Sequence, residues 1–464
     1  MLPLILLALG CTEKDALDSA PPDTSPTDDS AEVSREVAPG IFTLDTLEWG
    51  AEVDDLAPLG AIIGDARVTA LGESVHYSGG YHAARARIIP YLVEELGFRA
   101  VAFEGPWLTA ESSRPYVERC EGALVDAMAG LYFSVWQSAD QGRVMEWLCA
   151  WNSAHPDDVV HFWGFDIQEP WRDGPWLRGL LEGVDAEGTQ ALRDGVSDCF
   201  GAGYADLTAL YADPEAAAVM DGTGAWPEER GARCEATLPQ VDAWLETHAT
   251  AVSAAHDAET VALAHIAVTA IGAAHGEMTQ LYDPGPAGWD ARDQGMFEVF
   301  QALRALRAPE DKVIIFAHNA HIVAAGEQIA PYVYPQGWVD MGSHLATALG
   351  DDYAPIGFVA DEVVYNWPGQ GTNTSRARQN SAEAALTEVG ASPLLIDLAA
   401  ASADGSFLAP DTAYGFGHPG TGTLVPAAHF RGLLFLDSSP EMAFWQQGLR
   451  GTGAASPNPP PPAP

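Results

Sequence analysis

The chain contains six short segments in which apolar residues follow one another with few polar interruptions. They are RVTALGE (67–73), RAVAFEG (99–105), DVVHFWGFD (158–166), KVIIFAHN (312–319), APIGFVA (354–360) and GLLFLD (432–437). A strand buried on both faces has this continuous pattern, whereas a strand with one exposed face alternates between apolar and polar residues. The six segments therefore predict a mainly parallel sheet whose two faces are both covered.

Helical patterns lie between these segments. YHAARARIIPYLVEELGF, between the first two, has the apolar spacing of a helix up to Gly97, which predicts a strand–helix–strand unit. From about residue 170 to 308 the sequence is rich in Ala, Glu and Leu without a strand-like segment, which predicts a helical insertion. The expected fold class is α/β, a three-layer core with a mainly parallel sheet and a large helical insertion, in a domain spanning 41–450.

The two ends of the chain differ from this domain in composition. Residues 1–11 are an apolar run, too short to span a bilayer, that ends in ALGC and resembles the lipobox of bacterial lipoproteins. Residues 12–40 are rich in Pro, Asp and Ser and cannot bury enough apolar surface to fold. We expect a lipoprotein-type signal peptide, a disordered tether and a disordered tail over 451–464.

Lipidation of Cys11 follows from that interpretation. The protein is then exported and held by a lipid anchor in the membrane of the bacterial cell envelope, as a periplasmic or outer-membrane lipoprotein. An ordinary secretory signal and a misassigned start codon are the alternatives.

Charge and cysteine content restrict the partners and the compartment. The chain has 22 Lys and Arg against 65 Asp and Glu, a formal net charge of −43, so it repels phosphate backbones and we expect no nucleic acid partner. Four cysteines remain if Cys11 carries lipid, and an even number in an exported protein predicts two disulfides. Pairing of neighbours in sequence is the simplest of the possible connectivities. Those four are Cys120, Cys149, Cys199 and Cys234.

Chemically active side chains recur where the apolar segments end. Glu73 and His76 follow the first segment, Glu104 ends the second, Asp166 ends the third, and His318 and His321 follow the fourth. In an α/β sheet, ligands bind outside the carboxyl ends of the parallel strands. We therefore expect these residues to converge on one polar site.

Several chemistries are compatible with LGESVHYSGG (71–80). Ser74 lies in a pattern similar to the nucleophile elbow G-x-S-x-G, but His76 occupies the place of the final glycine, which argues against a serine hydrolase. Glu73, His76, His318 and His321 could instead bind a divalent metal in a metal-dependent hydrolase or peptidase, although neither pair has the H-E-x-x-H spacing. A third class is a surface binding protein that keeps the pocket without turnover.

The remaining chemistry uses water directly and needs no cofactor. A histidine beside a carboxylate has its tautomer fixed and acts as a general base near neutral pH, which predicts that His76 is the base and that Glu73 orients it. Arg85 follows on the predicted helix and could meet a developing oxyanion, as could protonated His318 or His321.

These residues stand in segments that resemble the erythromycin esterase family. The segments are ALGESVH (70–76) with Arg85, LVEELGFRAVAFEGPW (92–107), GFDIQ (164–168), ARDQGMFEVF (291–300), IIFAHNAHI (314–322) and MGSHLATALGDDYAPIGFV (341–359). The resemblance implies an α/β core with a helical insertion and hydrolysis of a small-molecule cyclic ester, with a macrolide ring as one candidate, by activated water.

Carried over by position, the resemblance makes His76 the general base and adds the other site residues. Those residues are Glu73, Arg85, Glu104, His318 and His321, with Asp166, Arg292 and Asp293 in support. One segment departs from the family, which commonly has glycine and then a Glu-Phe pair after this histidine. Here the chain has YSGGYH (77–82), so we expect the substrate-facing edge to differ.

Overall fold

The computed structural model describes most of the chain between Arg35 and Trp445. The described ranges are 35–199, 228–280, 285–331, 335–367, 371–403, 408–409, 412–415 and 422–445. The expected signal peptide, Cys11, the tether up to residue 34 and the tail over 451–464 lie outside these residues. All described strands and helices belong to the unit that begins at Arg35.

The central sheet contains all six predicted strands, side by side and parallel. Their order across the sheet is β13-β8-β3-β6-β4-β5. The strands are β3 (Val68–Leu71), β4 (Phe98–Pro106), β5 (His161–Asp166), β6 (Lys312–Phe316), β8 (Tyr353–Trp367) and β13 (Gly432–Ser439). The prediction of a mainly parallel sheet is confirmed.

Short strands that the sequence pattern did not predict extend this sheet. Antiparallel pairing adds β10 (Leu394–Asp397), β2 (Ile41–Thr43) and β1 (Glu36–Ala38) beyond β13, and β9 (Gly371–Arg376) pairs with β8. A separate small sheet consists of β11 (Tyr414–Gly415), β12 (Gly422–Leu424) and β7 (Ala330–Pro331). Most are too short to show a periodicity. Because β1 lies inside the segment expected to be a disordered tether, the fold begins earlier than predicted.

Helices cover both faces of the sheet, which gives the three layers that were predicted. In β6, Ile314 and Phe316 face the core formed with α1 (Ala57–Ile63), α2 (Gly79–Glu94) and α6 (Ala139–Ala154). Val313 and Ile315 face the opposite core, formed with α13 (Ala287–Arg307) and α15 (Met341–Leu349). Every residue of this strand after the first is buried, because alternate side chains enter two different cores.

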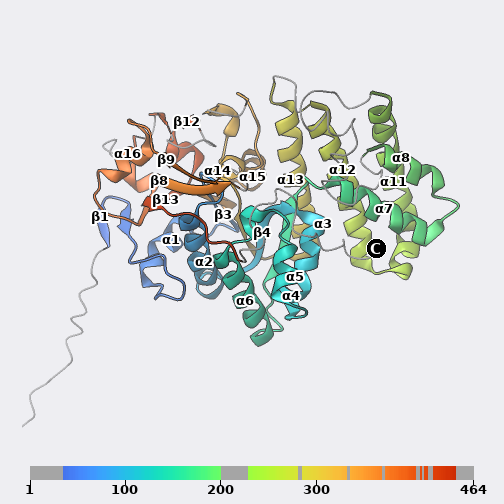
Figure 1. Cartoon of the computed structure of the whole chain (residues 1–464), viewed down its shortest axis with the longest axis horizontal. Helices are drawn as coiled ribbons and strands as arrows, with labels where there is room; N and C mark the ends of the chain where they lie inside the picture. The colour runs from blue at the N-terminus through green and yellow to red at the C-terminus, as the bar shows by residue number, and fades with distance from the viewer. Residues whose placement is uncertain are drawn as a thin grey trace, which may run out of the picture. The chain divides into compact units, whose positions relative to one another are not determined.

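Within the predicted insertion, the described residues form long helices and no strand. They are α7 (Pro170–Asp185), α8 (Gln190–Cys199), α11 (Glu228–Ala255), α12 (Ala258–Gln280) and α13. Figure 1 shows α7, α8, α11 and α12 gathered on the far side of α13 from the strands. Among the described helices, α12 alone is long and apolar enough to cross a membrane, and 56% of that stretch is buried inside the protein, as in the core helix of a soluble domain.

The remaining helices are short and connect the strands to the covering layers. They are α3 (Trp107–Ala110), α4 (Arg114–Arg119), α5 (Leu124–Ala129), α14 (Asn319–Ile322), α16 (Ala382–Thr387), α17 (Leu398–Ala401) and α18 (Pro426–His429). The predicted helix between the first two strands is α2, which continues through Pro90. Its connection to β4 turns at Gly97, where φ is 71° and favours glycine.

Two disulfides join neighbouring cysteines, as predicted. Cys120–Cys149 links the end of α4 to α6, and Cys199–Cys234 links α8 to α11. The first pair is half-buried, whereas both cysteines of the second have no exposed surface.

We expect a mild reductant to open these two bonds in a fixed order. A thiolate must reach a sulfur atom to break a disulfide, so access controls the rate. Cys120–Cys149 should be reduced and alkylated first, while Cys199–Cys234 persists until the insertion opens. Mass spectrometry of alkylated peptides, sampled during incubation of the native protein with dithiothreitol, measures the order. Simultaneous loss of both bonds would contradict it.

Candidate active site

The structure brings the predicted site residues together at the carboxyl edge of the parallel strands. Neighbouring strands β3, β6, β4 and β5 end there, and each supplies one or more of the predicted groups. Glu73 follows β3, Glu104 lies in β4, Asp166 ends β5, and His318 follows β6. Residues far apart in sequence therefore meet because the strands end at one edge.

His76 and Glu73 form the centre of this cluster. Nδ1 of His76 lies 2.5 Å from Oε1 of Glu73. Burial alone would lower the pKa of His76, but the hydrogen bond and charge of Glu73 outweigh it, and the pKa is raised. The side chain of His76 is 25% exposed and that of Glu73 is 0% exposed, so the imidazole lies between a buried carboxylate and the surface.

Arg85 holds Glu73 from the other side. Its Nη2 donates to Oε2 of Glu73 at 2.7 Å and its Nη1 donates to the carbonyl of Gly72 at 3.3 Å. Burial opposes ionisation of Glu73, but the charge of Arg85 and the bond to His76 keep its pKa well below its ordinary value. The guanidinium is buried and lies 5.3 Å from the ring centre of Trp136. Arg85 is thus engaged with Glu73, which supports a positioning role in place of the expected contact with an oxyanion.

A second centre surrounds Glu104. Arg292, on α13, lies 3.3 Å from Oε1 of Glu104 and 2.8 Å from Oδ2 of Asp166. The backbone N–H of His318 donates to Oε2 of Glu104 at 2.8 Å. Burial opposes ionisation of Glu104, but the charges of His321, His76 and Arg292 lower its pKa to about 2. A buried guanidinium therefore joins the two carboxylates, and Glu104 is held as an anion.

His321 and His318 have different environments. Nδ1 of His321 lies 2.8 Å from Asp293, and burial is outweighed by the charges of Asp293 and Glu104, so the pKa of His321 is raised. Nε2 of His318 donates to the carbonyl of Ser74 at 3.1 Å while its Nδ1 accepts from the N–H of Ala320 at 3.2 Å. Burial and the charge of His76 lower the pKa of His318 to about 3. His318 is thus a neutral, fully bonded side chain that braces the loop before His76.

Asn319, between the two histidines, was not singled out in the sequence. Its backbone N–H donates to the carbonyl of Glu73 at 2.8 Å, and its side chain bonds both backbone groups of Phe358. A Cβ at Gly72 would lie 1.8 Å from its Oδ1, so glycine is required there. Asn319 therefore fixes the Glu73 loop between β6 and β8.

His82 is a further group that sequence reasoning missed. It lies on α2, three residues before Arg85, and its Nε2 lies 3.9 Å from Oε2 of Glu73. Burial and the charge of Arg85 lower the pKa of His82 to about 3, so its ring is neutral. The i, i+3 spacing on one helix face was the signal that could have found it.

Two of the proposed chemistries are not favoured by this geometry. The hydroxyl of Ser74 lies 2.7 Å from the hydroxyl of Tyr81, and both are buried. Within the part of the chain that the structure describes, this hydroxyl is bonded to a tyrosine and not to a histidine. Among the described residues, no three His, Cys, Asp or Glu side chains are arranged to hold one metal ion. Each of the four groups of the metal hypothesis is already hydrogen-bonded within the protein.

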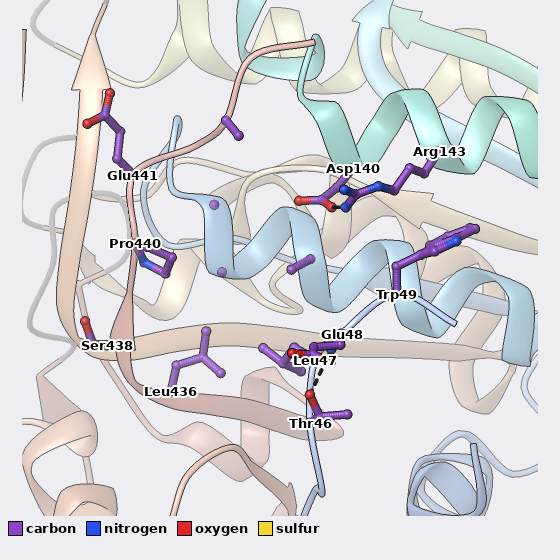
Figure 2. A pocket seen from close by; sticks show the side chains of 14 residues that line it. Thr46, Leu47, Glu48, Trp49, Asp140, Arg143, Leu436, Ser438, Pro440 and Glu441 are labelled. Carbon is purple, nitrogen blue, oxygen red and sulfur yellow. Dashed lines mark hydrogen bonds and ion pairs between the residues drawn. The ribbon is translucent and has the colours of Figure 1, made fainter. Parts of the chain in front are cut away.

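A separate groove lies beside the beginning of α2. It has a volume of about 650 Å³ and is lined by Trp49, Gly79, Gly80, Asp140 and Glu441, among others. Figure 2 shows it beside the beginning of α2, with Trp49 and Arg143 on one side and Glu441 on the other. None of the predicted site residues lines it.

The fold and the site define an α/β protein with a buried cluster of carboxylates, imidazoles and guanidinium groups at the carboxyl edge of its parallel strands. Residues 93–438 match the model of the erythromycin esterase family. Because this match covers more than half of the chain, the chain belongs to the erythromycin esterase family. Membership supports a hydrolase of that type, and it agrees with the family expected from the sequence.

The chain is also similar in sequence to an erythromycin esterase and to a putative hydrolase. Erythromycin esterase type II of Escherichia coli is 25% identical over 322 residues, 66% of this chain and 72% of that protein. A putative hydrolase of Bacillus subtilis (strain 168), YbfO, is 29% identical over 114 residues, 25% of each chain.

Solved structures share the fold. A protein from Bacillus cereus superposes with a TM-score of 0.68 at 19% identity, covering 87% of this chain and 96% of that chain. A mutant of the erythromycin esterase EreC in its open conformation gives 0.64 at 18% identity, covering 85% and 96%. At these identities the superpositions concern the fold alone.

Proposed function

We propose that this protein hydrolyses a carboxylic ester or lactone with water that His76 deprotonates. One observation carries the proposal: of the buried cluster around Glu73, His76 alone presents a substantial part of its side chain, 25%, at the surface. The carboxylate at Nδ1 leaves Nε2 as the basic atom of the neutral ring, which is the arrangement that a general base requires.

The proposed reaction balances through one proton. Nε2 of His76 takes a proton from water, and the resulting hydroxide attacks the ester carbonyl. The tetrahedral intermediate then collapses, and the departing alkoxide takes the proton back from the imidazolium. The products are a carboxylic acid and an alcohol, or a hydroxy acid when the substrate is a lactone. Glu73 stabilises the imidazolium between these steps, and Arg85 holds Glu73 in place.

Glu104 and His321 are the groups we propose to orient the water or the oxyanion. They are 3.3 Å apart, and the charge of Glu104 acts on both His76 and His321. Arg292 contacts both Glu104 and Asp166, and Asp293 contacts His321. These buried contacts keep Glu104 and His321 in position. His318 braces the loop through Ser74.

The substrate that we propose is a small-molecule ester. The similarity to erythromycin esterase type II supports testing macrolide lactones, because that name describes the relative's activity. A panel of aryl esters, simple lactones and macrolides, assayed by proton release for the natural sequence and for His76→Ala, tests the function. Release that is equal for both proteins on every substrate, or absent from both, would contradict the proposal.

Replacing Glu73 with glutamine should move the pH profile of hydrolysis to lower pH. Activity requires neutral His76, and Glu73 raises the pKa of His76, so activity in the natural sequence rises as pH increases through that raised value. Loss of the carboxylate charge lowers the pKa, and the rise begins at lower pH. The plateau should also fall, by roughly tenfold or more, because the ring is less firmly oriented. The measurement is kcat/KM against pH for one hydrolysed ester.

Glu73→Asp is the matched control for that change, since it keeps the charge while shortening the side chain. Its acid limb should remain closer to that of the natural sequence than the limb of Glu73→Gln. An unchanged acid limb in Glu73→Gln would show that His76 is not the titrating base.

A further inference from the structure

The rim beside His76 carries a large apolar side chain that the proposed reaction does not use. Trp367 ends β8 and is 39% exposed, one of three large hydrophobic side chains that are exposed among the described residues. Its ring centre lies 6.1 Å from that of His76, at an interplanar angle of 74°, and 5.1 Å from that of Tyr77. The indole therefore presents apolar surface directly beside the proposed base, where a ring of a bound ester could pack on it.

Trp367 is the last residue of β8, in the part of this strand that extends beyond its pairing with β3 and β13. The first eight residues of β8 are buried within the sheet, whereas the stretch from Val364 to Trp367 pairs only with β9. β9 is almost entirely exposed. Ring contacts join Trp367 to His76 and Tyr77, so the end of β8 lies beside the loop that carries His76. Packing within the sheet therefore does not fix the position of Trp367.

Glu441 connects the hairpin formed by β8 and β9 to a second support. The amide of Asn366 and the hydroxyl of Thr372 donate to its two carboxylate oxygens at 2.6 and 3.0 Å. Figure 2 shows Ser438, at the end of β13, followed by Pro440 and Glu441, with the Glu441 side chain directed toward a strand. Asn366 and Thr372 belong to β8 and β9, on either side of the hairpin turn.

The segment Ser439–Trp445, which we call the strap, also holds the loop that follows His76. The N–H of Met442 donates to the carbonyl of Tyr77 at 3.1 Å, and the N–H of Gly79 donates to the carbonyl of Pro440 at 2.6 Å. Tyr77 adopts a left-handed φ of 63°, which a non-glycine residue keeps only when its surroundings impose it.

The strap leaves no room for side chains at residues 79 and 80. A Cβ at Gly80 would lie 2.5 Å from Oγ of Ser439, and a Cβ at Gly79 would lie 2.8 Å from the carbonyl oxygen of Glu441. Glycine at both positions therefore lets the strap lie directly against this loop.

We propose that Trp367 is a specificity-determining residue: it forms an apolar wall for a bulky aromatic or polycyclic group of the ester whose carbonyl is attacked beside His76. Glu441 is a positioning residue that holds this wall through Asn366 and Thr372. The inference rests on the proposed function and adds to it a substrate class, esters with a large apolar group on the acyl or alcohol side. A flat ring stacked on the exposed indole would bury apolar surface on both partners.

Three esters test this inference. 4-Nitrophenyl acetate is small, 2-naphthyl acetate is bulky on the alcohol side, and 4-nitrophenyl 2-naphthoate is bulky on the acyl side. Trp367→Ala should raise KM about tenfold for at least one naphthyl ester while kcat/KM for 4-nitrophenyl acetate stays within about twofold, and Trp367→Phe should restore most of the difference. Glu441→Ala should give the same selective rise, and Glu441→Gln, which still accepts a hydrogen bond, should reverse most of it.

Trp49→Ala is the matched control, because Trp49 is a half-buried tryptophan in a groove that Glu441 borders but that neither Trp367 nor His76 lines. It should leave all three esters unchanged. Equal loss on all three esters in Trp367→Ala, no change on either naphthyl ester, or a selective loss in Trp49→Ala would each overturn the inference.

Binding of N-methyl-2-naphthamide, followed by calorimetry, separates this inference from the proposed function. This amide is not an ester, so its affinity does not depend on hydrolysis. If the natural sequence hydrolyses no ester but Trp367→Ala still weakens the amide about tenfold, the proposed function fails and the apolar wall stands. If esters are hydrolysed and neither KM nor amide affinity depends on Trp367, the wall fails and the proposed function stands.

Discussion

Replacing His76 with alanine is expected to reduce kcat/KM for ester hydrolysis by about 10²–10⁴-fold, the range supplied by a positioned general base. The free energy of unfolding should change little. The side chain is 25% exposed, and its loss leaves Glu73 paired with Arg85. Steady-state hydrolysis of the panel and urea unfolding of the same protein preparation measure the two quantities.

His155→Ala is the control for that experiment. His155 directly follows the end of α6, is exposed, and stacks on Trp151 with ring centres 4.0 Å apart, outside the site. Its replacement should leave hydrolysis unchanged. Retention of most activity in His76→Ala would exclude His76 as the base, whereas loss of both activity and folding would assign the residue a structural role.

Replacing Arg292 with methionine should cause the largest loss of stability, about 3–5 kcal/mol in the free energy of unfolding. Arg292 and its partners Glu104 and Asp166 are all nearly inaccessible to water. Methionine preserves much of the side-chain volume but removes the cation. Two buried carboxylates then lose a counter-charge that solvent cannot replace. Urea denaturation followed by circular dichroism measures the change.

An exposed pair provides the comparison. Arg119 and Glu121 are 2.9 Å apart, but their side chains are 51% and 61% exposed. Arg119→Met should cost about 0–1 kcal/mol, because water already screens this pair. If the two replacements had the same effect on unfolding, the buried network would not be a major contributor to stability.

The sheet was predictable from sequence where the signal was local and strong. The six parallel strands have runs of buried apolar residues, and one topological rule then places their ends together. β9 gave no such signal, since its sequence GTNTSR is polar and lies in water. β1, β2 and β10 are three or four residues long, so neither a period of two nor a continuous run can be recognised.

The sequence predicted which residues form the site better than it predicted the direction in which their side chains point. Glu73, His76 and Glu104 stand at strand ends, a position that sequence can specify. Whether Arg85 points to a substrate or to Glu73 depends on how α2 packs, and the structure places it on Glu73. Glu441 and Asn366 are 75 residues apart and in different elements, so no local pattern connects them.

The strap has a consequence for the order of events during synthesis. Ser439 bonds Ser78 and Gly80, which precede it by 361 and 359 residues. A nascent chain therefore contains the base, its carboxylate and its guanidinium long before the segment that closes the loop behind them has left the ribosome. Contacts at such separation form late in folding, because closing a long loop costs entropy before any contact compensates for it. The site is completed only after the chain has been synthesised beyond Ser439.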